Sequence, residues 1–172
     1  INILTIKSLS LMSIFMKKVL FLIESLSGGG AEKVLSTMLQ HIDYKKFDIT
    51  LCCICNTGKY IDIVKPYVHY TYILPNPNEV KGWNQWIYKL KYKLIYNWLP
   101  LKWVYQWFVP HHADIEIAYV EGYATKLLSH STNKNSKKIA WVHIDLEKFH
   151  WTKSIYKSIS EEEDAYQKYN QI

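Results

Sequence analysis

The sequence contains no arginine, so its basic side chains are 21 lysines, which outnumber the 15 acidic side chains by six. Bidentate recognition of guanine edges favours arginine, so this absence argues against a sequence-specific nucleic-acid-binding protein. Glycine and proline are scarce, with six and five residues, which excludes collagen-like and low-complexity chains. Apolar runs all stay below the roughly 18 residues typical of a transmembrane helix, which argues against a simple membrane span.

Cysteine is also rare, and Cys52, Cys53 and Cys55 lie within four positions. An odd number so closely spaced forms no disulfide framework and indicates a reducing compartment. The three residues fall in a predicted strand, where Cys53 and Cys55 share one face and Cys52 lies on the other. We therefore expect buried structural thiols.

Metal-binding patterns are absent as well. The chain has no Asp-x-Asp motif, and the short run His111, His112 and Asp114 lacks a partner cluster. We expect no metal and no resident cofactor.

The composition that remains, 49% hydrophobic and 21% charged, is that of a globular domain. Residues 1–15 are apolar and serine-rich, but Lys17 and Lys18 follow this stretch, whereas a signal peptide places its basic residues first. We expect Met16 to be the true start and residues 1–15 to be an extension or read-through outside the fold. A short anchor is the alternative.

Apolar patterning predicts alternating strands and helices. The predicted strands are residues 17–24, 47–55, 68–74, 113–121 and 138–144. The predicted helices are residues 31–42, 60–65, 83–109 (broken at Pro100), 123–131 and 158–169. This alternation predicts an α/β fold, a Rossmann-like parallel sheet with helices on both faces. The chain stops at Ile172, where a next strand would begin, so we expect residues 16–172 to be one domain of a longer protein.

The loop SLSGGG (25–30) joins the first predicted strand to a helix. Glycines there let backbone amides approach an anion at a helix N-terminus. The dinucleotide-binding pattern G-x-G-x-x-G is incomplete, because Lys33 stands where its third glycine belongs. Anion binding and a plain flexible turn both remain open on this evidence.

Two longer phrases carry a family resemblance. ESLSGGGAEKVLSTML and DIEIAYVEGYATKLLSHSTNKNSKKIAWVHIDL together resemble the N-terminal domain of group 1 (family 4) retaining glycosyltransferases of the two-domain GT-B type, as found in capsule and lipopolysaccharide synthesis. The resemblance covers residues 16–172, with both motifs in the expected order. It implies half of a GT-B fold, with the aromatic stretch as a helical insertion.

In that family the N-terminal domain mainly binds the acceptor, and a C-terminal domain binds the nucleotide-sugar and carries a pair of closely spaced glutamates. Glu24 and Glu32 have a similar spacing, but they span a strand, a loop and a helix start in the other domain. We do not expect them to be that pair. The donor domain is expected to be absent from this chain, which alone is expected to lack activity.

The candidate site residues follow the predicted strands, because ligands of α/β sheets bind at the carboxyl ends of strands. The resemblance implies a catalytic role for His143, in WVHID, and donor or acceptor binding by Gly28, Gly29 and Gly30. Glu121 is a second catalytic candidate, because a carboxylate at the carboxyl end of a strand can hydrogen-bond a sugar hydroxyl. The further candidates for donor or acceptor binding are Glu32, at a helix start, Gly122, beside Glu121, and Asp145, near His143. For each side chain a structural role is the alternative: Glu32 as a helix-dipole acid, Glu121 as a capping acid, and His143 as a packed imidazole.

The implied reaction moves a sugar from a UDP- or GDP-linked donor to a glycan or lipid-linked acceptor, with retention, in surface polysaccharide synthesis. The N-terminal domain would supply positioning and hydrogen bonds more than a nucleophile. The alternative is a standalone, non-catalytic Rossmann-like module that binds a sugar, a phosphate or a membrane.

Residues 80–110 contain five Trp, four Tyr and five Lys but no acidic residue. Lysine with tryptophan and tyrosine fits an anionic headgroup layer, so we expect peripheral contact with the inner face of the cell membrane and a cytoplasmic location. The expected contact residues are Trp83, Trp86, Lys89, Lys93, Trp98, Trp103 and Trp107. A helical hairpin packed on its own sheet and an RNA-stacking patch are the alternatives; we expect no nucleic-acid partner.

Overall fold

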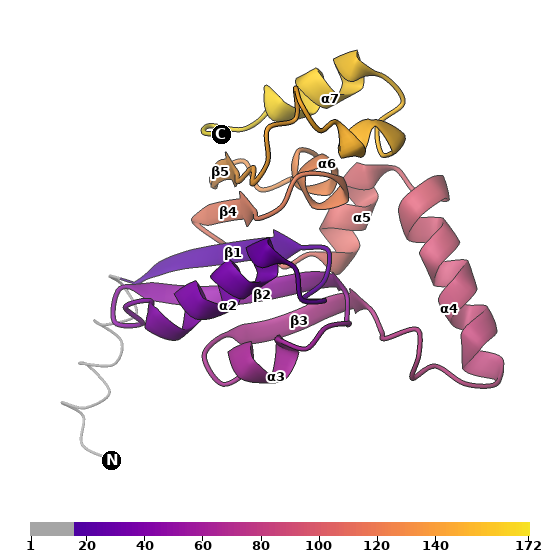
Figure 1. Ribbon diagram of the computed structural model, residues 1–172, viewed down its shortest axis with the longest axis horizontal. Helices are drawn as coiled ribbons and strands as arrows, with labels where there is room; N and C mark the ends of the chain where they lie inside the picture. Colours follow the sequence, from indigo (N-terminus) through magenta and orange to yellow (C-terminus); the bar gives the residue numbers. More distant parts are fainter. Residues whose placement is uncertain (1–15) are drawn as a thin grey trace.

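The computed structural model describes residues 16–172, so the predictions for residues 1–15 lie outside the described part of the chain. Five parallel strands form one sheet in the order β3-β2-β1-β4-β5 (Figure 1). They are β1 (Lys17–Ile23), β2 (Phe47–Cys55), β3 (His69–Leu74), β4 (Ile115–Ala118) and β5 (Lys137–Ala140). This is the predicted Rossmann-like α/β architecture.

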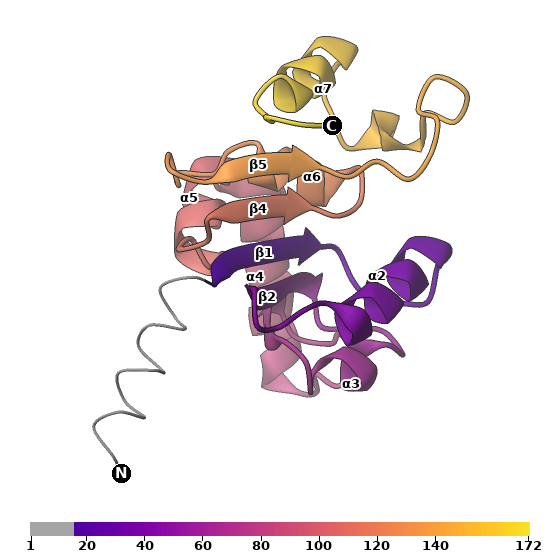
Figure 2. The ribbon, with the colours of Figure 1, turned by 90° about the vertical axis from the view of Figure 1, so that its left-hand side faces the viewer.

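Helices cover both faces of the sheet (Figure 2). Helices α2 (Gly30–His41) and α3 (Ile61–Val64) lie on one face, and α5 (Leu101–Phe108) and α6 (Tyr123–Leu128) lie on the other. The remaining elements are α4 (Trp83–Lys93), a π-helical turn (Leu94–Trp98), a 3-10 turn (Trp151–Ser154) and α7 (Ile159–Tyr166).

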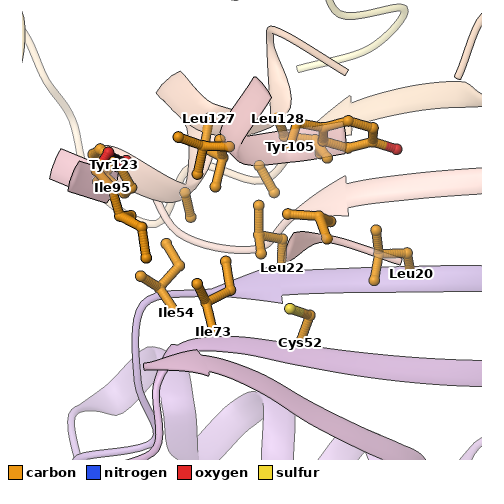
Figure 3. Close-up of a cluster of buried hydrophobic side chains, with 14 of the residues drawn as sticks. Leu20, Leu22, Cys52, Ile54, Ile73, Ile95, Tyr105, Tyr123, Leu127 and Leu128 are labelled. Atoms are coloured by element: carbon orange, nitrogen blue, oxygen red, sulfur yellow. Dashed lines mark hydrogen bonds between the residues drawn. The ribbon is translucent and has the colours of Figure 1, made fainter. Parts of the chain in front are cut away.

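Alternation along the strands divides the apolar side chains between two cores, because successive residues of a strand point to opposite faces. Leu20 and Leu22 of β1 face α5 and α6 (Figure 3), whereas Phe21 faces α2 and α3. Cys52 and Cys53 likewise lie in opposite cores, as predicted. Burial raises the pKa of the Cys53 thiol to about 12, so this thiol stays protonated and unreactive at neutral pH.

Strands β4 and β5 end earlier than predicted. The last bond of their ladder joins the Trp141 amide to the Ala118 carbonyl at 2.8 Å. Beyond Ala118 the chain turns toward α6, so residues after Ala140 have no neighbouring strand to pair with. The predicted strand 138–144 is therefore wrong at its end, and His143 lies in a loop rather than in the sheet.

The aromatic stretch is broken at Pro100, as predicted, but it is not one helix. Helix α5 packs on the sheet through Val104 and Tyr105, which are fully buried. Helix α4 stands apart as an arm (Figure 1), and all eleven of its residues remain at least partly exposed. The alternative interpretation, a helical hairpin packed on its own sheet, therefore holds for α5, whereas α4 reaches the sheet and its core only through a few side chains such as Tyr88 and Lys91.

The C-terminal segment returns to the sheet after α7. The Ser158 hydroxyl caps α7 by accepting the Glu161 amide at 3.1 Å. Further on, the Ala140 amide donates to the Gln171 carbonyl at 2.9 Å, and Gln171 forms a parallel bridge with Ile139. A further parallel pairing thus begins beside β5.

Candidate functional site

A pocket of about 440 Å³ opens at the carboxyl edge of the sheet. There β1 lies between β2 and β4, and the chain continues from β1 to α2 on one face and from β4 to α6 on the other. Ligands of open α/β sheets bind at such a switch point. This edge pocket is lined by Ile23, Glu24, Ser25, Glu32, Cys55, Thr57, Tyr96, Val120 and Trp151.

The glycine loop (residues 25–30) borders the edge pocket and is held by the loop that follows β2. The Leu26 amide donates to the Thr57 carbonyl at 2.9 Å. Gly58 has a φ of 129°, and a β-carbon there would overlap the Leu26 backbone. Only glycine allows this close approach of the two loops, so Gly58 fixes the position of the glycine loop.

The first turn of α2 offers both an anion-binding and a hydroxyl-binding surface. Within residues 16–172 no side chain caps this helix, whose N-cap is Gly29. The Glu32 carboxylate folds back over Gly29, and the Lys59 amine lies beside Gly28, 3.3 Å from where a β-carbon would stand. Amide donors, a lysine and a carboxylate thus meet at one loop.

Glu24 shares the edge pocket with Glu32, although the two glutamates were set aside on sequence grounds as a donor-type pair. Burial raises the pKa of the Glu24 carboxyl, and interaction with the Tyr96 hydroxyl opposes that rise. Two carboxylates that flank a loop can accept hydrogen bonds from several hydroxyl groups of one ligand.

A row of three closely packed tyrosine rings forms one wall of the site. The Tyr96 ring lies 4.5 Å from that of Tyr92 and 4.3 Å from that of Tyr123, between centroids. The Tyr123 hydroxyl donates to the Ile95 carbonyl at 2.7 Å, which ties the π-helical turn to α6. A second pocket of about 530 Å³ runs along these three rings, and it shares Glu24 and Tyr96 with the edge pocket.

The Glu121 carboxylate accepts hydrogen bonds from two other segments of the chain. One carboxylate oxygen accepts the His143 backbone amide at 3.1 Å, and the other accepts the Trp151 indole N–H at 3.2 Å. The residue is only 3% exposed. Glu121 thus joins the predicted His143 to Trp151, which lines the edge pocket.

The His143 ring is fixed by its neighbours. Its Nε2 lies 2.8 Å from the Tyr119 carbonyl, which can only accept, so Nε2 carries the proton and Nδ1 is the acceptor nitrogen. The ring stacks on Trp141, with 6.0 Å between centroids. The Tyr119 hydroxyl is fully buried without a hydrogen-bond partner among residues 16–172. Burial, aided by nearby Glu32, raises its pKa to about 12.

Gly122 and Asp145 have local contacts. Gly122, with a φ of 107°, is the N-cap residue of α6, and a β-carbon there would come within 2.9 Å of the Trp151 ring. The exposed Asp145 carboxylate accepts the Glu147 amide at 3.1 Å and pairs with Lys148 at 2.9 Å. The Lys148 hydrogen bond lowers the pKa of Asp145. Neither residue lines the edge pocket.

The seven predicted membrane-contact residues are all exposed. Trp83, Trp86, Lys89 and Lys93 belong to α4 and Trp98 to the π-helical turn, whereas Trp103 and Trp107 belong to α5. Within residues 16–172, no helix combines the length and apolar character needed to cross a bilayer. The same range holds no group of three or more His, Cys, Asp or Glu side chains suited to a metal ion.

Comparison with models of known families and with curated proteins finds no match for this sequence.

Proposed function

We propose that the chain is the acceptor-binding domain of a retaining glycosyltransferase that uses a nucleotide-sugar. The observation that carries this proposal is the edge pocket, where Glu24 and Glu32 flank a glycine loop and an aromatic wall adjoins them. Carboxylates recognise the hydroxyl groups of a sugar, and aromatic rings pack on its apolar faces. The resemblance to family 4 glycosyltransferases supports the same assignment.

In the proposed reaction the bond between the sugar's anomeric carbon and the donor phosphate breaks, and a bond to an acceptor oxygen forms. The acceptor proton goes to the leaving diphosphate of the UDP- or GDP-sugar. A second domain outside the described sheet would hold the nucleotide. The present domain orients the acceptor, which is a positioning contribution to the rate.

The residues of the edge pocket and of the segments around it have distinct roles in this proposal. Glu24 and Glu32 accept hydrogen bonds from acceptor hydroxyls, and His143 offers its Nδ1 as a further acceptor. Lys59 and the free amides of α2 face the donor diphosphate. Glu121 is a positioning residue, because its carboxylate oxygens hold His143 and Trp151.

The test uses the complete gene product that carries this domain. It is incubated with UDP- and GDP-sugars and a lipid and glycan extract, and released nucleoside diphosphate is measured. We expect Glu24→Gln and Glu32→Gln to lower turnover at least tenfold while nucleotide affinity stays unchanged, because an amide accepts fewer hydrogen bonds. Glu79→Gln, at an exposed loop position, serves as the matched control.

Loss of turnover in both edge-pocket variants, with the control intact, supports the proposal. If no UDP- or GDP-sugar is consumed, or if both variants transfer at the wild-type rate, the proposed acceptor role is wrong.

A second candidate is a non-catalytic binding module. The observation that favours it is the internal use of Glu121, whose two oxygens are both taken up by donors of the same chain. Such a module would bind a saccharide or a nucleoside diphosphate at the edge pocket without turnover. Ligand-induced changes in tryptophan fluorescence, lost in Trp151→Phe, together with the absence of product, would favour this candidate.

A further inference from the structure

We propose that the outward face of α4 docks the protein on an anionic lipid bilayer. This inference goes beyond the proposed glycosyl transfer and does not depend on it. The outward face consists of Trp83, Trp86, Lys89 and Lys93, whose spacing of three, three and four residues places them along one side of a helix.

The opposite side of α4 is the one attached to the protein. Lys91 donates to the Ile73 carbonyl at 2.6 Å, and its amine lies 5.1 Å from the centre of the Phe108 ring. Tyr88 packs against the core beneath α5 and α6. These contacts settle which side of α4 faces the protein and which faces solvent.

The outward face exposes two large apolar side chains. Trp83 is 81% exposed and Trp86 is 62% exposed, which is unusual for the largest aromatic side chain. A groove of about 540 Å³ along α4 includes Trp86, Lys89 and Lys93 of the outward face, and the rest of its lining is Tyr88, Leu90, Tyr92, Asn97 and Trp98. An apolar groove with tryptophan at its rim suits the boundary between headgroups and acyl chains.

Charge identifies the occupant. Residues 80–110 hold five lysines and no acidic side chain. Lys89 and Lys93 line the groove, and all four ion pairs that lysines form with acidic side chains within residues 16–172 lie outside this stretch. Lysine amines beside tryptophan rings match an anionic headgroup layer, which attracts each such charge near its surface.

The groove also leads toward the edge pocket. It shares Tyr92 and Asn97 with the second pocket, which in turn shares Glu24 and Tyr96 with the edge pocket. A bilayer docked on α4 would therefore lie beside a series of adjoining pockets, the last of which is at the sheet's carboxyl edge. Docking would bring membrane-borne molecules close to these pockets.

The experiment measures partition of the full chain into vesicles by sedimentation and by the blue shift of tryptophan emission. Vesicles of phosphatidylglycerol with phosphatidylcholine are compared with phosphatidylcholine alone, at low and high salt. We expect binding to the anionic vesicles only, weakened by salt because added ions screen lysine charges.

Two pairs of variants locate the contact. Lys89→Glu with Lys93→Glu should lower the partition coefficient at least about thirtyfold, since two lysine charges near the surface are worth about 1 kcal/mol each and the new carboxylates are repelled as well. Trp83→Ser with Trp86→Ser should lower it by about tenfold or more and should remove most of the blue shift. The matched controls are Lys45→Glu with Lys134→Glu, and Tyr67→Ser with Phe149→Ser, all at exposed positions outside the predicted membrane-contact residues.

The proposal is overturned if the α4 variants bind as the wild type does, if either control pair loses as much binding, or if neutral vesicles bind equally well. Binding to single-stranded RNA with the same variant sensitivity, and none to vesicles, would also overturn it. Since the readout is partition, failure of the proposed glycosyl transfer leaves this result unaffected.

Discussion

Gly28, Gly29 and Gly30 are neighbours in the sequence, but a β-carbon would meet different surroundings at each of them. Gly28 has a φ of 124°, which disfavours other residues, and a β-carbon would stand 2.8 Å from Lys59 Cε. At Gly29 the obstacle is the flexible end of Glu32, and at Gly30 nothing lies within 4 Å. Gly28 is therefore required by the backbone conformation, whereas Gly29 leaves room for the Glu32 side chain.

We expect three alanine variants of this loop to differ in stability. Gly28→Ala should lose about 1–3 kcal/mol of unfolding free energy because of its backbone strain. Gly30→Ala, at the start of α2, should gain about 0.5–1 kcal/mol by restricting the unfolded chain. Gly29→Ala should stay close to wild type and displace Glu32. Urea midpoints measure all three, and equal midpoints for Gly28→Ala and Gly30→Ala would contradict this interpretation.

Glu24 should make stability depend on pH, because burial raises the pKa of its carboxyl in the folded state. Between the unfolded and the folded pKa the folded protein holds more protons, so this group's contribution to stability falls as pH rises through that interval. The amide that replaces the carboxyl in Glu24→Gln does not titrate. The difference between the melting temperature of Glu24→Gln and that of the wild type should therefore shift in favour of the variant as pH increases from about 4 to about 7.

Thermal unfolding of both proteins at intervals across that range measures the effect. Glu79→Gln, at an exposed position, is the control and should run parallel to the wild type. A constant difference between Glu24→Gln and wild type at every pH would show that burial does not perturb this carboxyl.

At the scale of elements, the sequence predicts best where a pattern is local. The period of α2 places Leu35 and Leu39 on one face, and both are fully buried. The alternation of Cys52 and Cys53 is likewise confirmed by their positions in opposite cores. A helix or strand that repeats its own period needs no information from distant residues.

Element ends depend on distant partners and were predicted less well. The apolar run after Ala140 reads as strand, yet β4 has already turned toward α6 and offers no further pairing. The sequence predicted that α4 is helical, but it did not predict that α4 has no buried residue. Burial depends on which distant elements pack against a helix. No local pattern contains that information.

The candidate site shows the same division. The glycine loop and Glu32 could be found from their spacing, and Glu32 and Ser25 of that loop line the edge pocket. Trp151 was missed because it meets Glu121 from 30 residues away. Lys59 lies in the loop that follows β2, and the sequence marks that loop only by its glycine, Gly58. Glu24 was discounted through an analogy with a different domain.

At the scale of the whole molecule, one sheet supplies both cores. Leu22 and Phe21 are adjacent in β1 and belong to the core beneath α6 and the core beneath α2, respectively. If either core unfolds, it disrupts the strands that also line the other core. Among the elements of residues 16–172, α4 has no buried residue, so it can open locally with little disturbance of this arrangement.

We therefore expect the domain to unfold in one transition. Leu35→Ala removes a buried side chain on the α2 face and Leu127→Ala removes one on the α6 face. Each should cost about 2–5 kcal/mol and should shift the far-ultraviolet circular dichroism and the tryptophan fluorescence to the same new midpoint. Hydrogen exchange should show the strands opening together while α4 amides exchange by local opening. Two separated transitions, with Leu35→Ala moving only one, would instead mean that the two faces of the sheet are independent folding units.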